Sequence, residues 1–375
     1  MLVTPKGGQY WRYKYRYQGV EKLLALGTWP RTSLKEARFK RDDARKLLDQ
    51  NIDPSAQRQA EKRSRSDTFN TVADEWLARQ QTKLADSTYA KTKQLLGLLS
   101  PKFGKRPVST IQPPEVLKAL RAIESRGAHE TAQRCCQIAG RVFRYAISIG
   151  KATQNPAADL AGALTPPTVR HRSAITEPRA FGGLLRTIDA YGGEPTTRAA
   201  LQLLALLFTR PSELRLAQWS EFDLDRGSWV IPVERMKTKR EHRVPLSESA
   251  VSILRELQEI TGGQKLVFPG LRPGRPISEN TMNYALRNMG IGPDQHTAHG
   301  FRSSASTLLH EMGYPPEVIE LQLAHAQRNQ VAAAYNRSAR LGEREDMMQN
   351  WADYLDGLRQ GNNVVNLKRH GTAYQ

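Results

Sequence analysis

Residues 201–214 read LQLLALLFTRPSEL and join two predicted helices through a Thr-Arg-Pro junction. Residues 201–208 are apolar apart from Gln202, which is typical of a buried helix. The proline starts a new helix, so Arg210 stands at a helix N-terminus, where anions bind well, with the carboxylate of Glu213 three residues later. Taken alone, the junction favours a terminal charge beside a capping glutamate over a functional site.

The net charge of the chain points to a polyanionic partner. Lys and Arg number 56 against 37 Asp and Glu, which leaves +19 over 375 residues. A hydrophobic content of 39% is enough to build cores, and about 150 residues per domain predicts two or three domains. The excess is about +9 for residues 1–66, about +6 for 67–168 and about +4 for 169–375. Since every segment is basic, we expect each to contact nucleic acid or, alternatively, an anionic membrane surface; cations that merely solvate helix faces are the plainer explanation.

Nothing in the sequence indicates a membrane or an oxidising compartment. The longest apolar run, residues 201–208, is far shorter than the roughly 20 residues that a bilayer demands. The first residues hold no apolar core of a signal peptide. The only two cysteines, Cys135 and Cys136, are neighbours on a predicted helix and poorly placed to pair. We therefore expect no membrane partner and a cytoplasmic location.

Two polar stretches divide the chain. Residues 59–67 lack apolar periodicity, and residues 162–173 carry a Pro-Pro pair in a basic context. Both stretches are typical of linkers. The predicted domains are residues 1–58, 67–161 and 174–358, followed by a polar tail at 359–375.

The N-terminal unit alternates aromatic and cationic residues. Residues 10–17 read YWRYKYRY, and this period of two predicts a strand with a ring face and a cation face. Residues 21–26 predict a second strand. Ser33 and Glu36 form a capping box for a helix that ends near Leu48. The candidate DNA contacts on the cation face are Arg12, Lys14 and Arg16.

The middle unit, residues 68–161, is predicted to be all-helical. Helices are indicated near Thr71, after Ser87 as an N-cap, at Pro113 and over residues 131–148. Four helices of this size form a compact bundle. Its candidate contacts to a DNA backbone, which solvated helix faces explain as well, are Lys83 and Lys91.

Further pieces of the C-terminal unit carry side chains suited to chemistry. Residues 229–246 predict a hairpin whose tip, residues 236–240, is cationic. His299 and Arg302 are three residues apart and so share one face of a predicted helix. Each piece alone has a plain structural explanation, such as solubility at a tip or a tyrosine in a core. The remaining two residues of this kind are His325 and Tyr335.

Taken in order, these residues resemble the catalytic series of the tyrosine recombinases, the phage integrase family. That series is Arg, Lys, His-x-x-Arg, His or Trp, and Tyr. The surrounding sequences TRPSELR at 209–215, AAYNR at 333–337 and MMQNWADYL at 347–355 are similar to the P4-like prophage integrases of genomic islands. In this chain the series is Arg210, Lys237, His299, Arg302, His325 and Tyr335.

The resemblance implies a multidomain chain that is mainly α with small β-sheets. It implies an N-terminal α/β arm-binding unit, an all-α SAM-like core-binding bundle and an α+β tyrosine recombinase catalytic domain. The family usually supplies a strand before the Gly7-Gly8 turn, whereas only residues 1–6 precede it here. We therefore expect the arm-type DNA-binding domain to be N-terminally shortened.

Attack on a DNA phosphodiester without a metal explains why these residue types are needed. The transition state carries extra negative charge on its oxygens, which fixed cationic donors stabilise. Arginine suits this task because it stays charged and offers paired, planar donors. A phenol with a pKa near 10 needs nearby cations or a base before it attacks, and the leaving alkoxide needs a proton.

The resemblance implies a role for each position. Tyr335 is the nucleophile that forms a 3′-phosphotyrosyl link, His299 is the base or proton shuttle, and Lys237 is the general acid, with Lys239 as its alternative. No cofactor, metal or ATP is expected, because the sequence has no P-loop, zinc spacing or acidic triad. The remaining assignments are Arg210, Arg302 and His325 as a transition-state clamp, Glu213 as the group that orients Arg210, and Lys239 and Arg240 as DNA contacts.

The sequence thus predicts a site-specific DNA recombinase that integrates and excises a prophage or genomic island. Its expected partners are double-stranded DNA at core and arm attachment sites, further copies of itself in a homo-tetramer on DNA, an excisionase and a DNA-bending host factor. Its expected location is the bacterial cytoplasm, at the nucleoid when bound. The alternatives are a type IB topoisomerase-like enzyme that nicks and reseals DNA, and a catalytically idle DNA-binding relic of an integrase.

Overall fold

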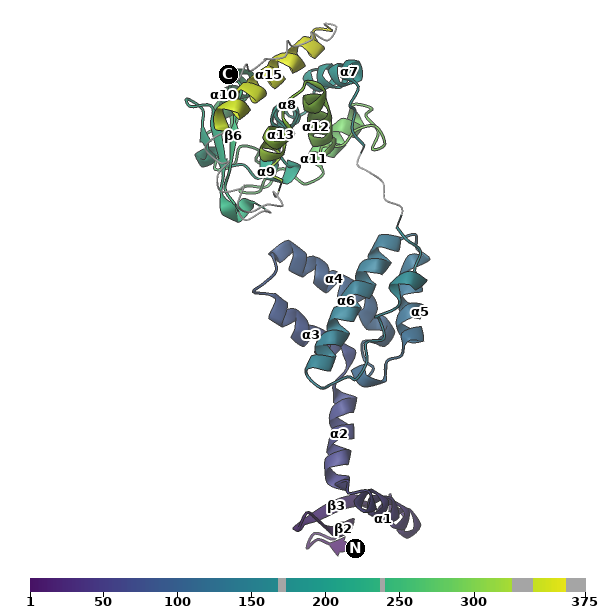
Figure 1. Ribbon diagram of the computed structural model, residues 1–375. Coiled ribbons are helices and arrows are strands. Elements are labelled where there is room, and N and C mark those ends of the chain that lie inside the picture. The colour runs from purple at the N-terminus through teal and green to yellow at the C-terminus, as the bar shows by residue number, and fades with distance from the viewer. Residues whose placement is uncertain (168–172, 237–239, 326–339, 362–375) are drawn as a thin grey trace, which may run out of the picture. The chain divides into compact units, whose positions relative to one another are not determined.

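The computed structural model describes residues 1–167, 173–236, 240–325 and 340–361 (Figure 1). The chain divides into two compact units, Met1–Val169 and Arg170–Gln375. Among the described residues, the first unit contains two separate clusters of buried apolar side chains and the second unit contains one. In the same residues, no helix combines the length and the apolar content needed to cross a membrane.

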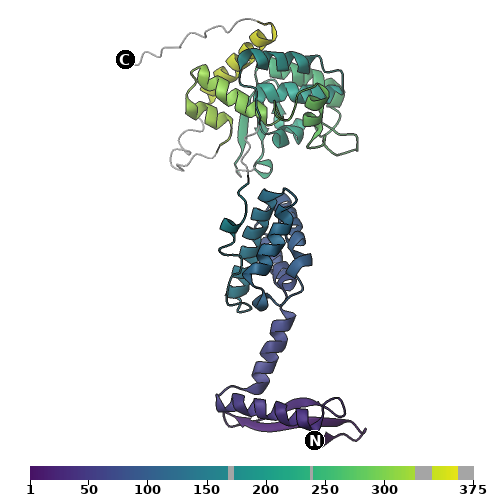
Figure 2. The ribbon, with the colours of Figure 1, turned by 90° about the vertical axis from the view of Figure 1, so that its right-hand side faces the viewer.

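The N-terminal sheet has three antiparallel strands in the order β1 (Leu2–Val3), β2 (Gln9–Tyr17) and β3 (Val20–Thr28). Helix α1 (Leu34–Asp49) lies along this sheet (Figure 2). The predicted alternation is confirmed: Tyr15 is buried, whereas Arg12, Lys14 and Arg16 are exposed. The two residues that precede β3 in the turn both have positive φ, as a two-residue hairpin turn requires.

The ends of the two N-terminal helices follow from local chemistry. The predicted capping box of α1 is confirmed, because Ser33 Oγ accepts the N–H of Glu36 while the Glu36 carboxylate accepts the N–H of Ser33. Helix α2 (Pro54–Ser66) takes in nearly all of residues 59–67, so this predicted linker is helical. Its residues include many good helix formers, which favour a helix without an apolar face.

The second apolar cluster of the first unit belongs to a bundle of four helices, as predicted. One correction concerns α4, which begins at Asp86 after Ala85, so the predicted N-cap at Ser87 is wrong. Asp86 provides negative charge in the first turn, which stabilises a helix N-terminus without a hydroxyl cap. Cys135 and Cys136 are buried and free. The elements are α3 (Phe69–Gln80), α4 (Asp86–Phe103), the 3-10 turn η1 (Val108–Thr110), α5 (Pro113–Glu124), α6 (His129–Ser148) and the 3-10 turn η2 (Ala161–Ala163).

The second unit combines helices with a small antiparallel sheet in the order β4-β5-β6. The predicted hairpin is formed by β5 and β6. The strands are β4 (Phe222–Asp223), β5 (Ser228–Ile231) and β6 (His242–Pro245), with 3-10 turns η3 (Trp219–Glu221) and η4 (Val233–Arg235). The helices are α7 (Pro178–Asp189), α8 (Pro195–Leu207), α9 (Pro211–Arg215), α10 (Glu248–Thr261), α11 (Thr281–Asn288), α12 (Gly300–Glu311), α13 (Pro316–Gln322) and α15 (Leu341–Arg359).

Helix α8 is the centre of the second unit. It contacts α7, α10, α11, α12 and α15 (Figure 1), and most of its side chains are buried, as its apolar sequence predicts. Helix α15 is fixed to it by the fully buried Trp351, whose Nε1 donates to the carbonyl of Ala205 at 3.0 Å. The apolar face of α15 therefore packs on its own unit.

Candidate active site

The junction between α8 and α9 holds Arg210 in a defined position. Phe208 ends α8 with a left-handed φ of 38°, and Arg210 is the N-cap of α9. The Glu213 carboxylate accepts the backbone N–H of Arg210 at 3.0 Å and its Nη1 at 2.7 Å. Glu213 is only 4% exposed, whereas the Arg210 side chain is 20% exposed. The buried carboxylate is thus paired, and it orients a guanidinium that still reaches the surface.

Arg302 lies on α12 and is 5% exposed. Its Nη1 donates to the carbonyl of Phe208 at 2.7 Å and its Nη2 to the carbonyl of Leu323 at 2.7 Å. Burial, with the positive charge of Arg210 as the next cause, lowers the pKa of Arg302 to about 10. The group therefore stays charged at neutral pH. Two backbone segments fix its plane.

Arg210 and Arg302 meet at the same turn after α13. Nη2 of Arg210 donates to the carbonyl of Ala324 at 3.3 Å, next to the Leu323 carbonyl bound by Arg302. Ala324 has a positive φ of 50°, which turns the chain out of the helix. Two guanidiniums that converge in this way are suited to binding an anion.

His325 follows directly and lies beside Arg302. Its Nε2 is 3.4 Å from Nη2 of Arg302, and its Nδ1 is 2.7 Å from a carboxylate oxygen of Glu320. The carboxylate accepts from Nδ1–H, and this contact turns Nε2 toward the guanidinium. The side chain is 47% exposed, so a substrate can reach it.

The other predicted site residues divide into two groups. His299 is the partly buried N-cap of α12 and therefore precedes Arg302 by nearly one turn. Lys237, Lys239 and Tyr335 lie outside the described residues. The structure thus brings Arg210, Glu213, Arg302 and His325 together and places His299 on the same helical turn as Arg302.

Sequence reasoning missed a buried polar layer beneath this site. Arg344 of α15 is 8% exposed and donates through Nε, at 3.0 Å, and Nη2, at 2.6 Å, to Oε1 of Gln322. His242 of β6 is buried, and its Nε2 is 3.1 Å from the carbonyl of Gln322. Burial first, and then the charge of Arg344, lower the pKa of His242 to about 3, so the ring is neutral. No local pattern marks these residues, because their partners are remote in the sequence.

The candidate DNA contacts of the first unit are all exposed. Arg12, Lys14 and Arg16 share the outer side of β2, and Lys14 pairs with Glu21 at 2.8 Å. Lys91 is exposed on α4 and donates to Gln94 at 3.2 Å.

Lys83 contributes to a basic hollow. This hollow of about 670 Å³ is lined by residues of α3 and α6 and by Lys83 just beyond α3. Two of its cations, Arg141 and Arg144, lie a turn apart on α6. They were not predicted from the sequence, because a solvated helix face explains such residues equally well. The cations of the hollow are Arg79, Lys83, Arg141 and Arg144. In the second unit, Arg240 is exposed just before β6.

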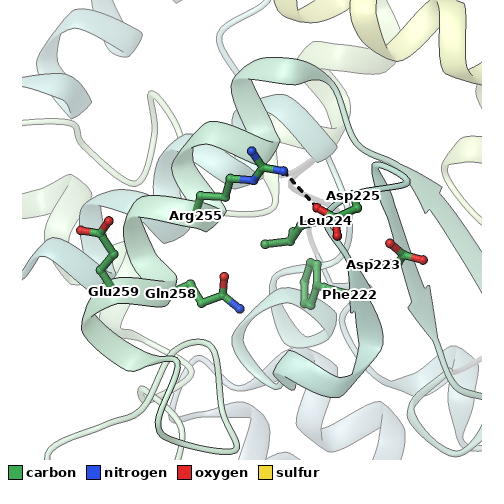
Figure 3. A pocket seen from close by; sticks show the side chains of 7 residues that line it. All are labelled: Phe222, Asp223, Leu224, Asp225, Arg255, Gln258 and Glu259. Atoms are coloured by element: carbon green, nitrogen blue, oxygen red, sulfur yellow. Dashed lines mark hydrogen bonds and ion pairs between the residues drawn. The ribbon is translucent and has the colours of Figure 1, made fainter.

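A larger hollow of the second unit lies elsewhere and has the opposite charge. Its volume is about 750 Å³. Figure 3 shows the side chains from the β4 region and α10 that line it. Asp223, Asp225 and Glu259 line it, and Arg255 pairs with Asp225 at 3.2 Å. Three carboxylates against one guanidinium repel a phosphate. This hollow is therefore not a candidate for DNA chemistry.

Comparison with known proteins covers almost the whole chain. Residues 1–61 match an arm DNA-binding domain, residues 69–163 the phage integrase central domain and residues 183–341 the phage integrase family. The chain is 40% identical to the integrase of Enterobacteria phage P4 over 94% of this chain and 85% of that protein. It is 38% identical to the putative protein IntB of Escherichia coli (strain K12) over 96% of this chain and 95% of that protein.

Solved structures agree on the fold. A lambda integrase dimer bound to a COC′ core site is similar with a TM-score of 0.59 and 18% identity, over 90% of this chain and 94% of that chain. The Tn1549 transposon integrase in complex with a circular intermediate DNA is similar with a TM-score of 0.60 and 14% identity, over 76% of this chain and 99% of that chain. The chain belongs to the phage integrase family and is a P4-like tyrosine site-specific recombinase.

Proposed function

We propose that this recombinase integrates and excises a prophage or genomic island by cutting and rejoining DNA through Tyr335. The observation that carries this proposal is the meeting of Arg210 and Arg302 at one turn, beside the exposed His325. Three donors held by backbone and carboxylate contacts suit the charge of a phosphoryl transition state, because they need little reorganisation during the reaction.

The proposed reaction is a transesterification. The Tyr335 oxygen bonds to phosphorus, the bond from phosphorus to the 5′ oxygen breaks, and that oxygen takes a proton from Lys237, or from Lys239. His299 accepts or relays the tyrosine proton. Because the 3′-phosphotyrosyl link conserves the bond energy, a 5′-hydroxyl of another duplex reverses the step without ATP. In this scheme Arg210, Arg302 and His325 hold the phosphate, and Glu213 orients Arg210.

We propose double-stranded DNA as the partner of all three predicted domains, 1–58, 67–161 and 174–358. The exposed cations of β2 would contact arm sites, and the basic hollow at Lys83 would contact the core site. Lambda integrase has been solved as a tetramer bound to a Holliday junction, which makes a homo-tetramer on DNA the natural proposal for this chain. An excisionase and a DNA-bending host factor complete the proposed assembly, at the nucleoid.

A nicked suicide substrate that carries the cognate core site tests the proposal. Wild type should accumulate a covalent protein–DNA adduct, and Tyr335→Phe should form none. Tyr284→Phe is the matched control, because Tyr284 is 65% exposed on α11 and should leave the adduct unchanged. Absence of the adduct with wild type, or equal adduct with Tyr335→Phe, contradicts the proposal. Relaxation of plasmids that lack the site would favour a topoisomerase-like activity instead.

A further inference from the structure

Arg235 lies at the base of the hairpin tip. It is the last residue of η4, which follows β5, and its side chain is only 14% exposed. Lys237 and Lys239 follow it by two and four residues in the sequence. The chain therefore enters the lysine segment directly from Arg235.

One end of the Arg235 guanidinium binds a buried carboxylate. Nη1 donates to both oxygens of Glu221, whose side chain is 7% exposed. The same carboxylate accepts Nε1–H of the buried Trp229 at 3.0 Å. Glu221 is thus held from two sides, which makes it a fixed anchor and not a solvated surface partner.

The other end of the guanidinium reaches the helix of the anion site. Nη2 of Arg235 donates to the backbone carbonyl of Glu213. The carboxylate of this same Glu213 holds Arg210. One side chain therefore connects the base of the hairpin tip to the residue that orients the guanidinium of Arg210.

We infer that Arg235 is a positioning residue: it anchors the end of η4, from which the chain continues into the two lysines, to the Arg210–Glu213 pair, and cleavage that needs a proton from these lysines depends on this anchor. The inference rests on the proposed function. A lysine on a long flexible stem donates its proton efficiently only when its backbone is held near the leaving oxygen, and misplacement by about 1 Å costs on the order of 10²-fold in rate.

The test compares two leaving groups on the same core site. In one nicked suicide substrate the scissile phosphate keeps its 5′-bridging oxygen, and in the other this atom is sulfur. The thiolate comes from a group with a pKa near 8.5 and leaves without a general acid, whereas the alkoxide needs a proton. The readout is the ratio of the single-turnover rates on the sulfur and oxygen substrates. This ratio does not depend on the fraction of protein that is folded.

Arg235→Gln should slow cleavage of the oxygen substrate by about 10²-fold and change cleavage of the sulfur substrate by less than about threefold. Lys237→Ala and Lys239→Ala are measured in parallel. They define the sulfur-to-oxygen rate ratio of a protein that lacks its general acid. Arg226→Gln is the matched control, since its side chain is 87% exposed and pairs with Asp223 at 3.7 Å. Its ratio should equal that of wild type.

Equal loss on both substrates for Arg235→Gln overturns the inference, because it shows a structural role only. The inference is also overturned if neither lysine variant changes the rate ratio. If Arg235→Gln is insoluble, Arg235→Lys and Glu221→Gln take its place with the same ratio as readout. Failure of the proposed function looks different: wild type would form no adduct on either substrate.

Discussion

The cations of the N-terminal sheet and those of the second unit differ in how they are held. Arg12, Lys14 and Arg16 project from β2 into solvent. Arg302 is 5% exposed and bound by the carbonyls of Phe208 and Leu323. Exposed cations add to affinity for any phosphate and are screened by salt, whereas a fixed, desolvated guanidinium acts on one phosphate.

The unit with the larger net charge is therefore not the unit whose guanidiniums are held most rigidly. The first unit holds most of the net charge of +19, and the cations proposed to contact DNA are exposed on its surface. The second unit is the least basic by net count, but hydrogen bonds hold the guanidiniums of Arg210 and Arg302 in fixed positions. We therefore expect substitutions in the second unit to alter rates, and substitutions in the sheet to alter affinity.

The largest effect is expected for Arg302→Ala. It removes one donor of the proposed phosphate clamp and leaves the carbonyls of Phe208 and Leu323 unpaired, so adduct formation should fall by about 10³-fold. The measurement is the single-turnover rate on the suicide substrate, with DNA affinity determined in parallel. Arg255→Ala, an exposed arginine of the acidic hollow, is the control and should keep the wild-type rate. A loss below tenfold would remove Arg302 from the proposed clamp.

A smaller loss is expected for Glu213→Gln. The amide keeps an acceptor for Arg210 but loses the charge, so the guanidinium becomes less well oriented and the rate should fall by about 10 to 10²-fold. DNA affinity should stay within about threefold of wild type, which separates orientation from binding. The control is Glu279→Gln, because Glu279 is an exposed carboxylate paired with Arg215 of α9. A change in affinity alone would contradict the prediction.

Acid should destabilise the second unit before the sheet. Burial lowers the pKa of His242 to about 3 and that of His296 to about 4, from an ordinary value of 6.5. Their stabilising contribution is complete above pH 6.5 and is lost as the pH falls, because the unfolded state then binds more protons. At pH 5 the loss of stability is about 2 kcal/mol for each histidine.

The N-terminal sheet loses stability only at a lower pH than the second unit. Burial alone would raise the pKa of Asp53, but hydrogen bonds from Lys22 and Tyr15 outweigh it and lower the pKa from 3.8 to about 2. Its contribution is therefore lost only as the pH falls below about 4. Hydrogen exchange on the full chain at pH 7, 5 and 3 should show α12 and α13 losing protection at pH 5 while β2 and β3 keep theirs. Simultaneous loss at pH 5 would contradict the assignment.

The smallest effect is expected on the sheet. Arg16→Ala should weaken DNA binding a few-fold and reduce the slope of log K against log salt by about one, since the proposed phosphate contact is lost. The cleavage rate at saturating DNA should not change. Lys46→Ala, an exposed lysine on α1, serves as the control. A rate effect without an affinity effect would reverse the comparison between the two regions.

The features that could be predicted from the sequence are those whose partners are close in the chain. The alternation in β2 and the Ser33–Glu36 capping box involve neighbours within four residues, and both are confirmed. The pairing of Glu213 with Arg210 spans three residues in the same way. The helical state of residues 59–66 was not predicted, because these residues show no apolar periodicity and a helix that is polar all round has none.

The surroundings of the site could not be predicted because they depend on remote contacts. The two carbonyl partners of Arg302 lie 94 and 21 residues away. Arg235 binds groups 14 and 22 residues away, so its sequence context indicates only a charge near a turn. The order of residue types indicated which side chains matter, but only the folded chain determines what fixes them.

The bridge between Gln322 and Arg344 has a consequence for chain entropy. Arg344 and Gln322 are 22 residues apart in the sequence, and their direct hydrogen bonds hold them together in the folded chain. The entropic cost of joining two points of an unfolded chain grows only slowly with their separation, by about 0.6 kcal/mol for each doubling. This contact therefore costs only about 0.6 kcal/mol more in chain entropy than a contact between residues half as far apart.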